Sequence, residues 1–202
     1  MTELLTCLGL LLVFCLSAYG WGWGANRLLP DSPRLSAAYL ATLGLSVWVA
    51  IGGILNAANI AYPIVLNLIL VLGIVLFVIS LRRWARDSES GSPGSYGWGE
   101  PRQPGSRTSS MLTFAPYLIV IAATAFNSMA LLPTGAFNHH DDFYKYLPRI
   151  VQMLQTGTLG GNPFSWVGAD SLGAQAFLQG FFVSHLPLLY VNCFDAVICF
   201  LL

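Results

Sequence analysis

The fold of this chain follows from an apolar run that ends in three closely spaced arginines, IVLNLILVLGIVLFVISLRRWAR, residues 64–86. A helix rises about 1.5 Å per residue, so about 20 apolar residues cross the roughly 30 Å of hydrocarbon in a bilayer. The run from Ile64 to Leu81 is close to that length and contains no charged residue. It therefore predicts a transmembrane helix that ends at Arg82.

Two similar apolar runs precede it, from Leu4 to Tyr19 and from Leu35 to about Leu55. A polar link at residues 26–34 separates them, and a short uncharged turn, residues 56–63, leads into the third run. A signal peptide has a basic N-terminus and a small-residue cleavage site, whereas this N-terminus opens with Glu3 and no other charge, so we interpret the first run as a retained helix. Residues 1–81 are therefore predicted to form three transmembrane helices.

The composition is that of a membrane protein. Of the 202 residues, 55% are hydrophobic and 9% are charged, whereas soluble domains carry about a quarter charged residues. The net charge is zero, and no basic block is longer than Arg82-Arg83, so no nucleic-acid partner is expected. The four cysteines lie in apolar runs without ligand spacing, and we interpret them as small buried hydrophobic residues. The predicted class is an all-α, polytopic transmembrane bundle in the lipid bilayer.

In the second half of the chain, a polar segment is followed by two further apolar runs. Residues 82–110 are rich in Gly, Ser and Pro, which predicts a flexible linker. Residues 111–132 form a fourth apolar run, and residues 172–202 form a last one, interrupted at His185-Leu186-Pro187. This last region is too long for one upright helix. It predicts a short interfacial or re-entrant helix and the beginning of another span, as at the start of a longer membrane domain.

The distribution of arginine predicts the orientation. Cytoplasmic loops of membrane proteins carry an excess of Lys and Arg, and five Arg lie in the 82–110 linker. With alternate crossings, the link at residues 26–34 is also cytoplasmic. The turn at residues 56–63 and the segment that follows residue 132 then lie on the exoplasmic side. The expected location is the plasma (inner) membrane, as a multi-pass protein.

Four titratable residues in a row, His139 to Asp142, open the stretch NHHDDFYKYLPRIVQMLQT, residues 138–156. Apolar residues recur there with a helical period, which predicts an amphipathic helix on the exoplasmic membrane surface with its apolar side toward lipid. Asp141 or Asp142 is its expected N-cap. Pro148 requires either a kink or a helix that starts nearer Tyr146. The apolar stripe comprises Phe143, Leu147, Ile150, Val151 and Leu154.

The sequence Asp-Asp-Phe-Tyr-Lys-Tyr-Leu-Pro-Arg-Ile, after an outward-leading helix, resembles the first external loop of the GT-C superfamily. These are polytopic glycosyltransferases that use polyprenyl-phosphate-linked sugars, such as the protein mannosyltransferases and the aminoarabinose transferases of lipid A. The resemblance covers residues 138–202, about a third of the chain. In the family the motif usually follows the first spanning helix, whereas here three predicted helices precede that one. The resemblance implies a glycosyltransferase of the cell envelope.

The resemblance also implies roles for the charged residues. Asp141 would be the base that activates the acceptor hydroxyl, and Asp142 would orient the acceptor or bind a divalent cation, Mg²⁺ or Mn²⁺. Lys145 and Arg149 would pair with the phosphate of the lipid-linked donor. His140 and Tyr144 complete the expected substrate-binding set.

Other interpretations stay open. The two aspartates are also suited to plain helix capping, and Lys145 and Arg149 to reaching lipid headgroups from an interfacial helix. A non-enzymatic polytopic protein, a transporter or an assembly subunit, is the alternative function. In that case the interrupted region 172–202 would line a solute path, together with Asp195, an ionisable residue within an apolar run.

Overall fold

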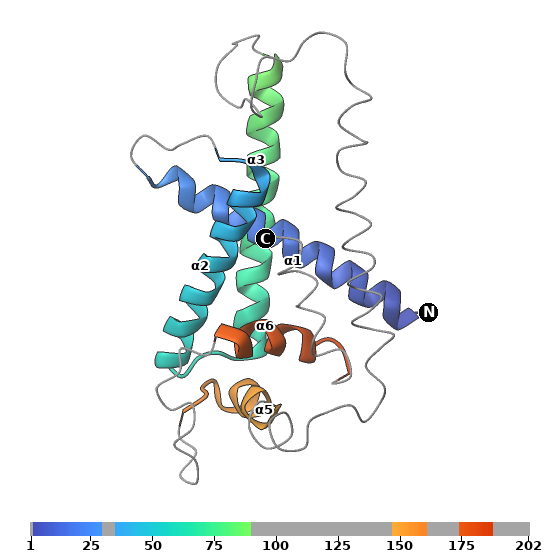
Figure 1. Ribbon diagram of the computed structural model, residues 1–202, viewed down its shortest axis with the longest axis vertical. Coiled ribbons are helices and arrows are strands. Elements are labelled where there is room, and N and C mark those ends of the chain that lie inside the picture. Colours follow the sequence, from blue (N-terminus) through green and yellow to red (C-terminus); the bar gives the residue numbers. More distant parts are fainter. Residues whose placement is uncertain (1, 30–34, 90–146, 161–173, 188–202) are drawn as a thin grey trace.

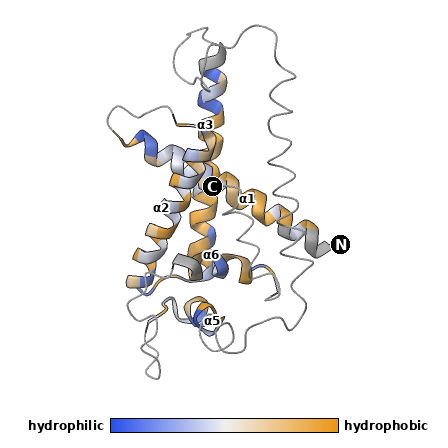
Figure 2. Cartoon of the chain, viewed as in Figure 1, coloured by the Kyte–Doolittle hydropathy of each residue, from blue (hydrophilic) through white to orange (hydrophobic). Residues whose placement is uncertain are grey.

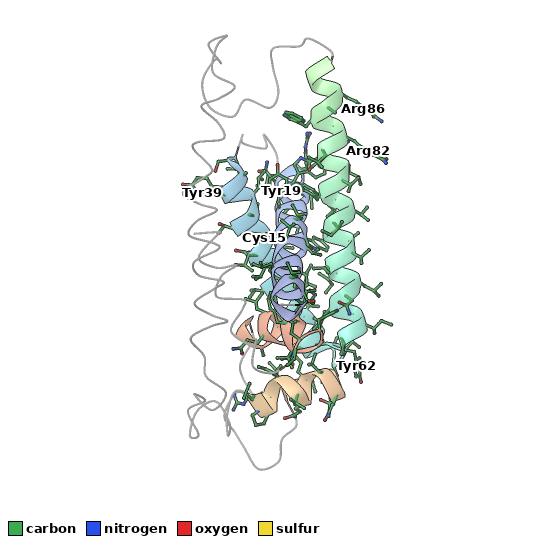
Figure 3. The ribbon with its side chains drawn as sticks, turned by 90° about the vertical axis from the view of Figure 1, so that its right-hand side faces the viewer. Cys15, Tyr19, Tyr39, Tyr62, Arg82 and Arg86 are labelled. Atoms are coloured by element: carbon green, nitrogen blue, oxygen red, sulfur yellow. The ribbon has the colours of Figure 1, made fainter. Side chains whose placement is uncertain are left out.

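The computed structural model describes residues 2–29, 35–89, 147–160 and 174–187, and the regular structure of these segments is helical (Figure 1). The predicted all-α class is confirmed. The three long helices form a bundle, and the two short ones lie across one end of it, with α6 between α5 and the long helices (Figures 1 and 3). The helices are α1 (Thr2–Arg27), α2 (Ala37–Ala57), α3 (Pro63–Glu89), α5 (Leu147–Thr156) and α6 (Ala174–Val183).

Within the described residues, three helices are long and apolar enough to span a membrane, as the sequence predicts for this part of the chain. The candidate spans are Leu8–Arg27, Ala37–Ala57 and Pro63–Arg86. Figure 2 shows apolar residues along most of α3 and hydrophilic residues at its C-terminal end. The predicted fourth span, residues 111–132, lies outside the described residues.

The end of α3 corrects the predicted start of the linker. The helix continues through the arginines to Glu89, so residues 82–89 are helical rather than flexible. Arginine and alanine favour helix, and a cation in the last turn, here Arg86, is stabilised by the negative end of the helix dipole. The polar residues after Leu81 therefore end the apolar span but not the helix.

Glycines bring the backbones of α1 and α2 into direct contact. A Cβ atom added to Gly44 of α2 would collide with the carbonyl oxygen of Ala18 in α1, and one added to Gly22 of α1 would collide with that of Leu40. Small residues at such crossings are typical of helix packing in membranes, because close approach increases van der Waals contact. The two glycines thus set the separation of the first two helices.

Two side chains of α1 donate hydrogen bonds to backbone carbonyls of α3. The Ser17 hydroxyl donates to the carbonyl of Leu70 at 3.0 Å, and the indole Nε1 of Trp21 donates to that of Ile69 at 3.0 Å. Ser17 is fully buried. Its hydroxyl is therefore satisfied inside an apolar bundle, where an unpaired polar group is costly.

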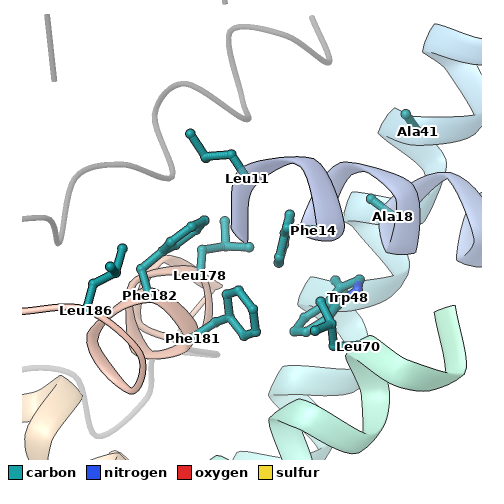
Figure 4. Packing of buried hydrophobic residues seen from close by; sticks show 10 residues of the cluster. All are labelled: Leu11, Phe14, Ala18, Ala41, Trp48, Leu70, Leu178, Phe181, Phe182 and Leu186. Atoms are coloured by element: carbon teal, nitrogen blue, oxygen red, sulfur yellow. The ribbon is translucent and has the colours of Figure 1, made fainter. Parts of the chain in front are cut away.

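Aromatic side chains join α6 to this bundle. The ring of Phe14 in α1 lies 5.0 Å from that of Trp48 in α2 and 5.5 Å from that of Phe181 in α6, centroid to centroid. Such tilted pairs of rings add to the free energy gained by burial. The cluster, shown in Figure 4, comprises Leu11, Phe14, Ala18, Ala41, Trp48, Leu70, Leu178, Phe181, Phe182 and Leu186.

α6 ends where the sequence predicts an interruption. After Val183 the chain turns through Ser184 and His185, and the N–H of Leu186 donates back to the carbonyl of Phe182 at 2.8 Å. Pro187 has no N–H with which to continue the helix. The predicted short helix before His185-Pro187 is therefore confirmed, and the residues after 187 lie outside the described segments.

Candidate functional site

The predicted surface helix is present as α5, Leu147–Thr156. Pro148 is its second described residue, and the residues before Leu147 lie outside the described segments. The choice between a kink at Pro148 and a helix that starts nearer Tyr146 therefore stays a prediction.

The apolar face of α5 packs on protein, which corrects the expected contact with lipid. Leu147, Ile150 and Met153 are buried, whereas Val151, a member of the predicted stripe, is 40% exposed. Met153 is 0% exposed and lies in a cluster with Leu55, Ala61, Leu66, Leu159 and Phe177. The buried face is thus rotated from the predicted stripe, toward α6 and the adjoining ends of α2 and α3.

The rotation has a steric reason. α6 presents Gly180 to α5, and a Cβ atom there would lie 2.7 Å from the Met153 Cε. The missing side chain therefore leaves the space that Met153 occupies. Sequence periodicity cannot predict this rotation of α5, because the rotation depends on which residue of another helix faces the apolar stripe.

The chain leaves α5 through Gly157 and turns onto the α2–α3 connection. Gly157 has φ +78°, and its N–H donates to the carbonyl of Met153 at 2.8 Å, which is how a glycine commonly ends a helix. Its own carbonyl accepts from the N–H of Ala61 at 2.8 Å. A Cβ atom on Gly157 would collide with the carbonyl oxygen of Asn59.

Asn56 completes this junction. Its side-chain oxygen accepts from the N–H of Leu159 at 2.7 Å and from the Thr158 hydroxyl at 3.1 Å. The end of α2 is itself fixed by a left-handed Asn59, φ 58°, with the N–H of Ile60 bonded to the carbonyl of Leu55. The sequence predicts only a short turn at Asn56 and does not predict this role. The available signal was weak: Asn and Gly are the residues that adopt positive φ.

The junction places α5 at the end of the bundle opposite the α3 arginines. Arg82 and Arg86 lie at one end and Tyr62 at the other, next to α5 (Figure 3). The predicted topology puts residues 56–63 and 138–156 on the same side of the membrane. Asn56 and Ala61 bond to residues 157–159, directly after α5, and the side of the membrane on which this end lies stays a prediction.

Arg149, a predicted phosphate ligand, is half-buried on α5. Its Nη2 atom is buried and has no hydrogen-bond partner among the described residues. In the next turn, Gln152 is satisfied, because its Nε2 donates to the carbonyl of Gly160 at 2.8 Å. A buried guanidinium N–H without an acceptor is costly, and its strongest partners are carboxylates and phosphates. Among the described residues, this cationic donor therefore has no acceptor.

The other predicted site residues lie outside the described segments: His140, Asp141, Asp142, Tyr144 and Lys145. The same holds for Asp195. Within the described residues no three His, Cys, Asp or Glu side chains come together, and the expected cation ligand, Asp142, is not among them. The divalent cation and the roles of these residues stay predictions.

Comparison of the chain with protein-family models, with curated proteins and with solved structures found no match. The function therefore has to be inferred from the residues of the chain and from the surroundings of α5.

Proposed function

We propose that the protein is a membrane glycosyltransferase, which moves a sugar from a polyprenyl-phosphate-linked donor to an acceptor at the exoplasmic face. The observation that carries this proposal is the buried Nη2 of Arg149, which lacks an acceptor among the described residues. A phosphate offers several acceptor oxygens and the charge that a guanidinium prefers, with two parallel hydrogen bonds.

The position of α5 supports a lipid-linked substrate. The phosphate of such a donor lies at the membrane interface, which is the level of a helix end in a spanning bundle. α5 contacts the end of α2 and the start of α3 through Asn56 and Ala61. Beside it, Ile64 and Leu68, one turn apart on α3, are 70% and 63% exposed. They offer an apolar surface along which a prenyl chain would extend into the bilayer.

The chemistry assigned to the charged residues is a displacement at the anomeric carbon. Asp141 takes the proton of the acceptor hydroxyl, and the acceptor oxygen forms a bond to that carbon. The bond from the same carbon to the phosphate oxygen breaks, and the electron pair leaves with the polyprenyl phosphate. Arg149 and Lys145 stabilise the charge on the leaving phosphate, while Asp142 orients the acceptor or holds a divalent cation that adds to this stabilisation.

The test is sugar transfer by the full chain in membranes, with a panel of radiolabelled polyprenyl-phosphate sugars. We expect Asp141→Asn to abolish transfer while binding of polyprenyl phosphate persists, because the base does not hold the donor. Arg149→Gln should raise the donor KM, and Arg149→Lys should restore part of the affinity, since lysine keeps the charge but not the two parallel hydrogen bonds. Full transfer by Asp141→Asn would overturn the proposal.

The matched control is Gln155→Ala, which changes an exposed residue of α5 away from the buried face. It should transfer sugar like the unmodified chain. A loss as large as that of Arg149→Gln would show that any change in α5 disturbs the protein, and the role of Arg149 would then be discarded.

A solute transporter is the second candidate, and the break after α6 favours it. α6 ends at Val183, just before His185-Pro187 in an apolar region, and discontinuous helices form the substrate sites of many transporters. This function predicts that Asp195→Asn changes solute uptake and that Asp141→Asn does not. The two variants, assayed for uptake and for sugar transfer, separate the candidates.

A further inference from the structure

The turn after α6 fixes the orientation of a histidine ring. The Nδ1 atom of His185 lies 3.0 Å from the carbonyl oxygen of Phe181 and 2.8 Å from the hydroxyl oxygen of Ser184. The ring centroids of His185 and Phe181 are 5.1 Å apart. One carbonyl, one hydroxyl and one aromatic ring therefore hold the imidazole in place.

These contacts decide which ring nitrogen carries the proton. A carbonyl oxygen only accepts, so the contact between Nδ1 and Phe181 is a hydrogen bond only when Nδ1 is protonated. The Ser184 hydroxyl donates its own proton to the same carbonyl at 2.7 Å, which leaves the hydroxyl oxygen as an acceptor as well. The other tautomer would turn a lone pair of Nδ1 toward the carbonyl. Nε2 is therefore the unprotonated nitrogen of the neutral His185 ring, and it accepts hydrogen bonds.

The Phe181 carbonyl has a reason to bind these side chains. In a continuing helix it would accept from the N–H of His185, four residues later. That N–H donates instead to the carbonyl of Phe182 at 3.1 Å. The carbonyl of Phe181 is thus one of the unpaired groups at a helix end, and the side chains of Ser184 and His185 satisfy it.

The ligand that suits Nε2 must supply a proton donor. His185 is exposed, whereas the Phe181 side chain next to its ring is fully buried. Nε2 lies on the other edge of the ring from Nδ1, so its lone pair is directed away from the Phe181 carbonyl. Ionised phosphates and carboxylates only accept hydrogen bonds, whereas hydroxyl groups donate them. Sugars are the substrates richest in hydroxyl groups.

The packing of α6 on α5 shows where this ring lies. Gly180 of α6 faces Met153. Val183, nearly one turn later, packs against Leu147 and Ile150 at the other end of α5. The two helices therefore run in opposite directions, and the turn after Val183 follows at the Leu147 end of α5.

We propose that Nε2 of His185 accepts a hydrogen bond from a sugar hydroxyl group of the substrate. The inference rests on the proposed function, which supplies the substrate class. Arg149, the proposed phosphate ligand, is at the same end of α5, and the sugar of a polyprenyl-phosphate donor is bonded directly to its phosphate. The hydroxyl belongs to this sugar or to the acceptor, since both lie beside the phosphate during transfer.

Two substitutions separate this role from a structural one. His185→Asn places an amide nitrogen near the position of Nδ1, so it keeps a donor to the Phe181 carbonyl but has no atom at the position of Nε2. His185→Gln reaches that position with a carbonyl oxygen and keeps an acceptor. Ser184→Ala is the matched control, because it removes the other hydrogen bond to the same carbonyl and leaves Nε2 in place.

The experiment measures binding and transfer of a radiolabelled polyprenyl-phosphate sugar by the full chain, at about pH 8, where histidine rings are mostly neutral. We expect His185→Asn to lower kcat/KM about fivefold, the contribution of one uncharged hydrogen bond. His185→Gln should lower it less, and Ser184→Ala should leave it unchanged. An equal loss of donor binding without acceptor assigns the hydroxyl to the donor sugar, and unchanged donor binding assigns it to the acceptor.

Monodeoxy analogues of the donor sugar test the donor assignment directly. One analogue should bind the unmodified chain about fivefold more weakly than the complete sugar does. His185→Asn should bind the two equally, because the partner of the missing hydroxyl is gone.

Three outcomes would overturn the proposal. Equal losses in His185→Asn and Ser184→Ala would show that the turn after α6 matters only as structure. Unchanged binding and transfer in His185→Asn would remove the role of Nε2 and leave the transferase function intact. If the unmodified chain neither bound nor transferred any sugar of the panel, the proposed function would fail, and the assignment of His185 with it.

Discussion

The side-chain oxygen of Asn56 accepts a hydrogen bond from the backbone N–H of Leu159 at 2.7 Å, although the two residues are 103 positions apart. It also accepts from the hydroxyl of Thr158. One amide at the end of α2 therefore holds the segment that follows α5. Because Arg149 is on α5, the position of the proposed phosphate ligand depends on this contact.

Asn56→Ala should detach the 157–160 segment. It removes the acceptor of two hydrogen bonds and leaves the Leu159 N–H unpaired, which costs about 1–3 kcal/mol. Hydrogen–deuterium exchange should show faster exchange at Leu159 and through α5, with α1 unchanged. Asn56→Asp keeps an acceptor oxygen and should protect Leu159. If both variants exchanged like the unmodified chain, Asn56 would have no such role.

Gly157→Ala should destabilise the end of α5. The residue has φ +78°, which costs a non-glycine residue about 1–2 kcal/mol, and its Cβ atom would collide with the carbonyl oxygen of Asn59. Thermal unfolding in detergent measures the loss. Gly160→Ala is the control in the same segment, because its Cβ atom would meet nothing closer than 3.5 Å. Similar melting temperatures for the two variants would contradict this account.

Met153→Ala should lower the free energy of unfolding by about 2–5 kcal/mol, as is usual for a large side chain removed from a packed core. Val151→Ala, two residues earlier and exposed, should change it by less than about 0.5 kcal/mol. Denaturant titration of the purified protein compares them. Equal and small losses would mean that α5 rests on lipid, as the sequence alone predicts, and not on α6.

Gly44→Ala should separate α1 from α2. The added methyl group would collide with the carbonyl oxygen of Ala18, and such overpacking costs about 1–3 kcal/mol. Gly9→Ala, on the exposed part of α1 with no atom within 4 Å of the new Cβ, should be neutral or slightly stabilising, because alanine favours helix. Unfolding temperatures in the same detergent distinguish the two, and a stable Gly44→Ala would refute the close crossing.

The two ends of the bundle should lie on opposite sides of the membrane. In a chain without its native cysteines, Gln155→Cys on α5 and Asn138→Cys should react with an impermeant maleimide added to intact cells. Arg86→Cys, exposed at the other end, should react only after permeabilisation. The reverse pattern would place α5 in the cytoplasm and remove the exoplasmic transferase site.

The sequence by itself determined the three spans, an amphipathic helix within residues 138–156 and the break at His185-Pro187. Each depends on local properties: the length of an apolar run against the thickness of a bilayer, a helical period, and a proline without an N–H. The tertiary structure alone decided which face of α5 is buried, because Met153 fits only where α6 presents Gly180. It also decided that Asn56 holds Leu159 and that Arg27 and Arg83 both approach the ring of Trp23. These contacts join segments that are distant in the chain, and they follow from how closely and at what rotation the helices pack, which no local pattern contains.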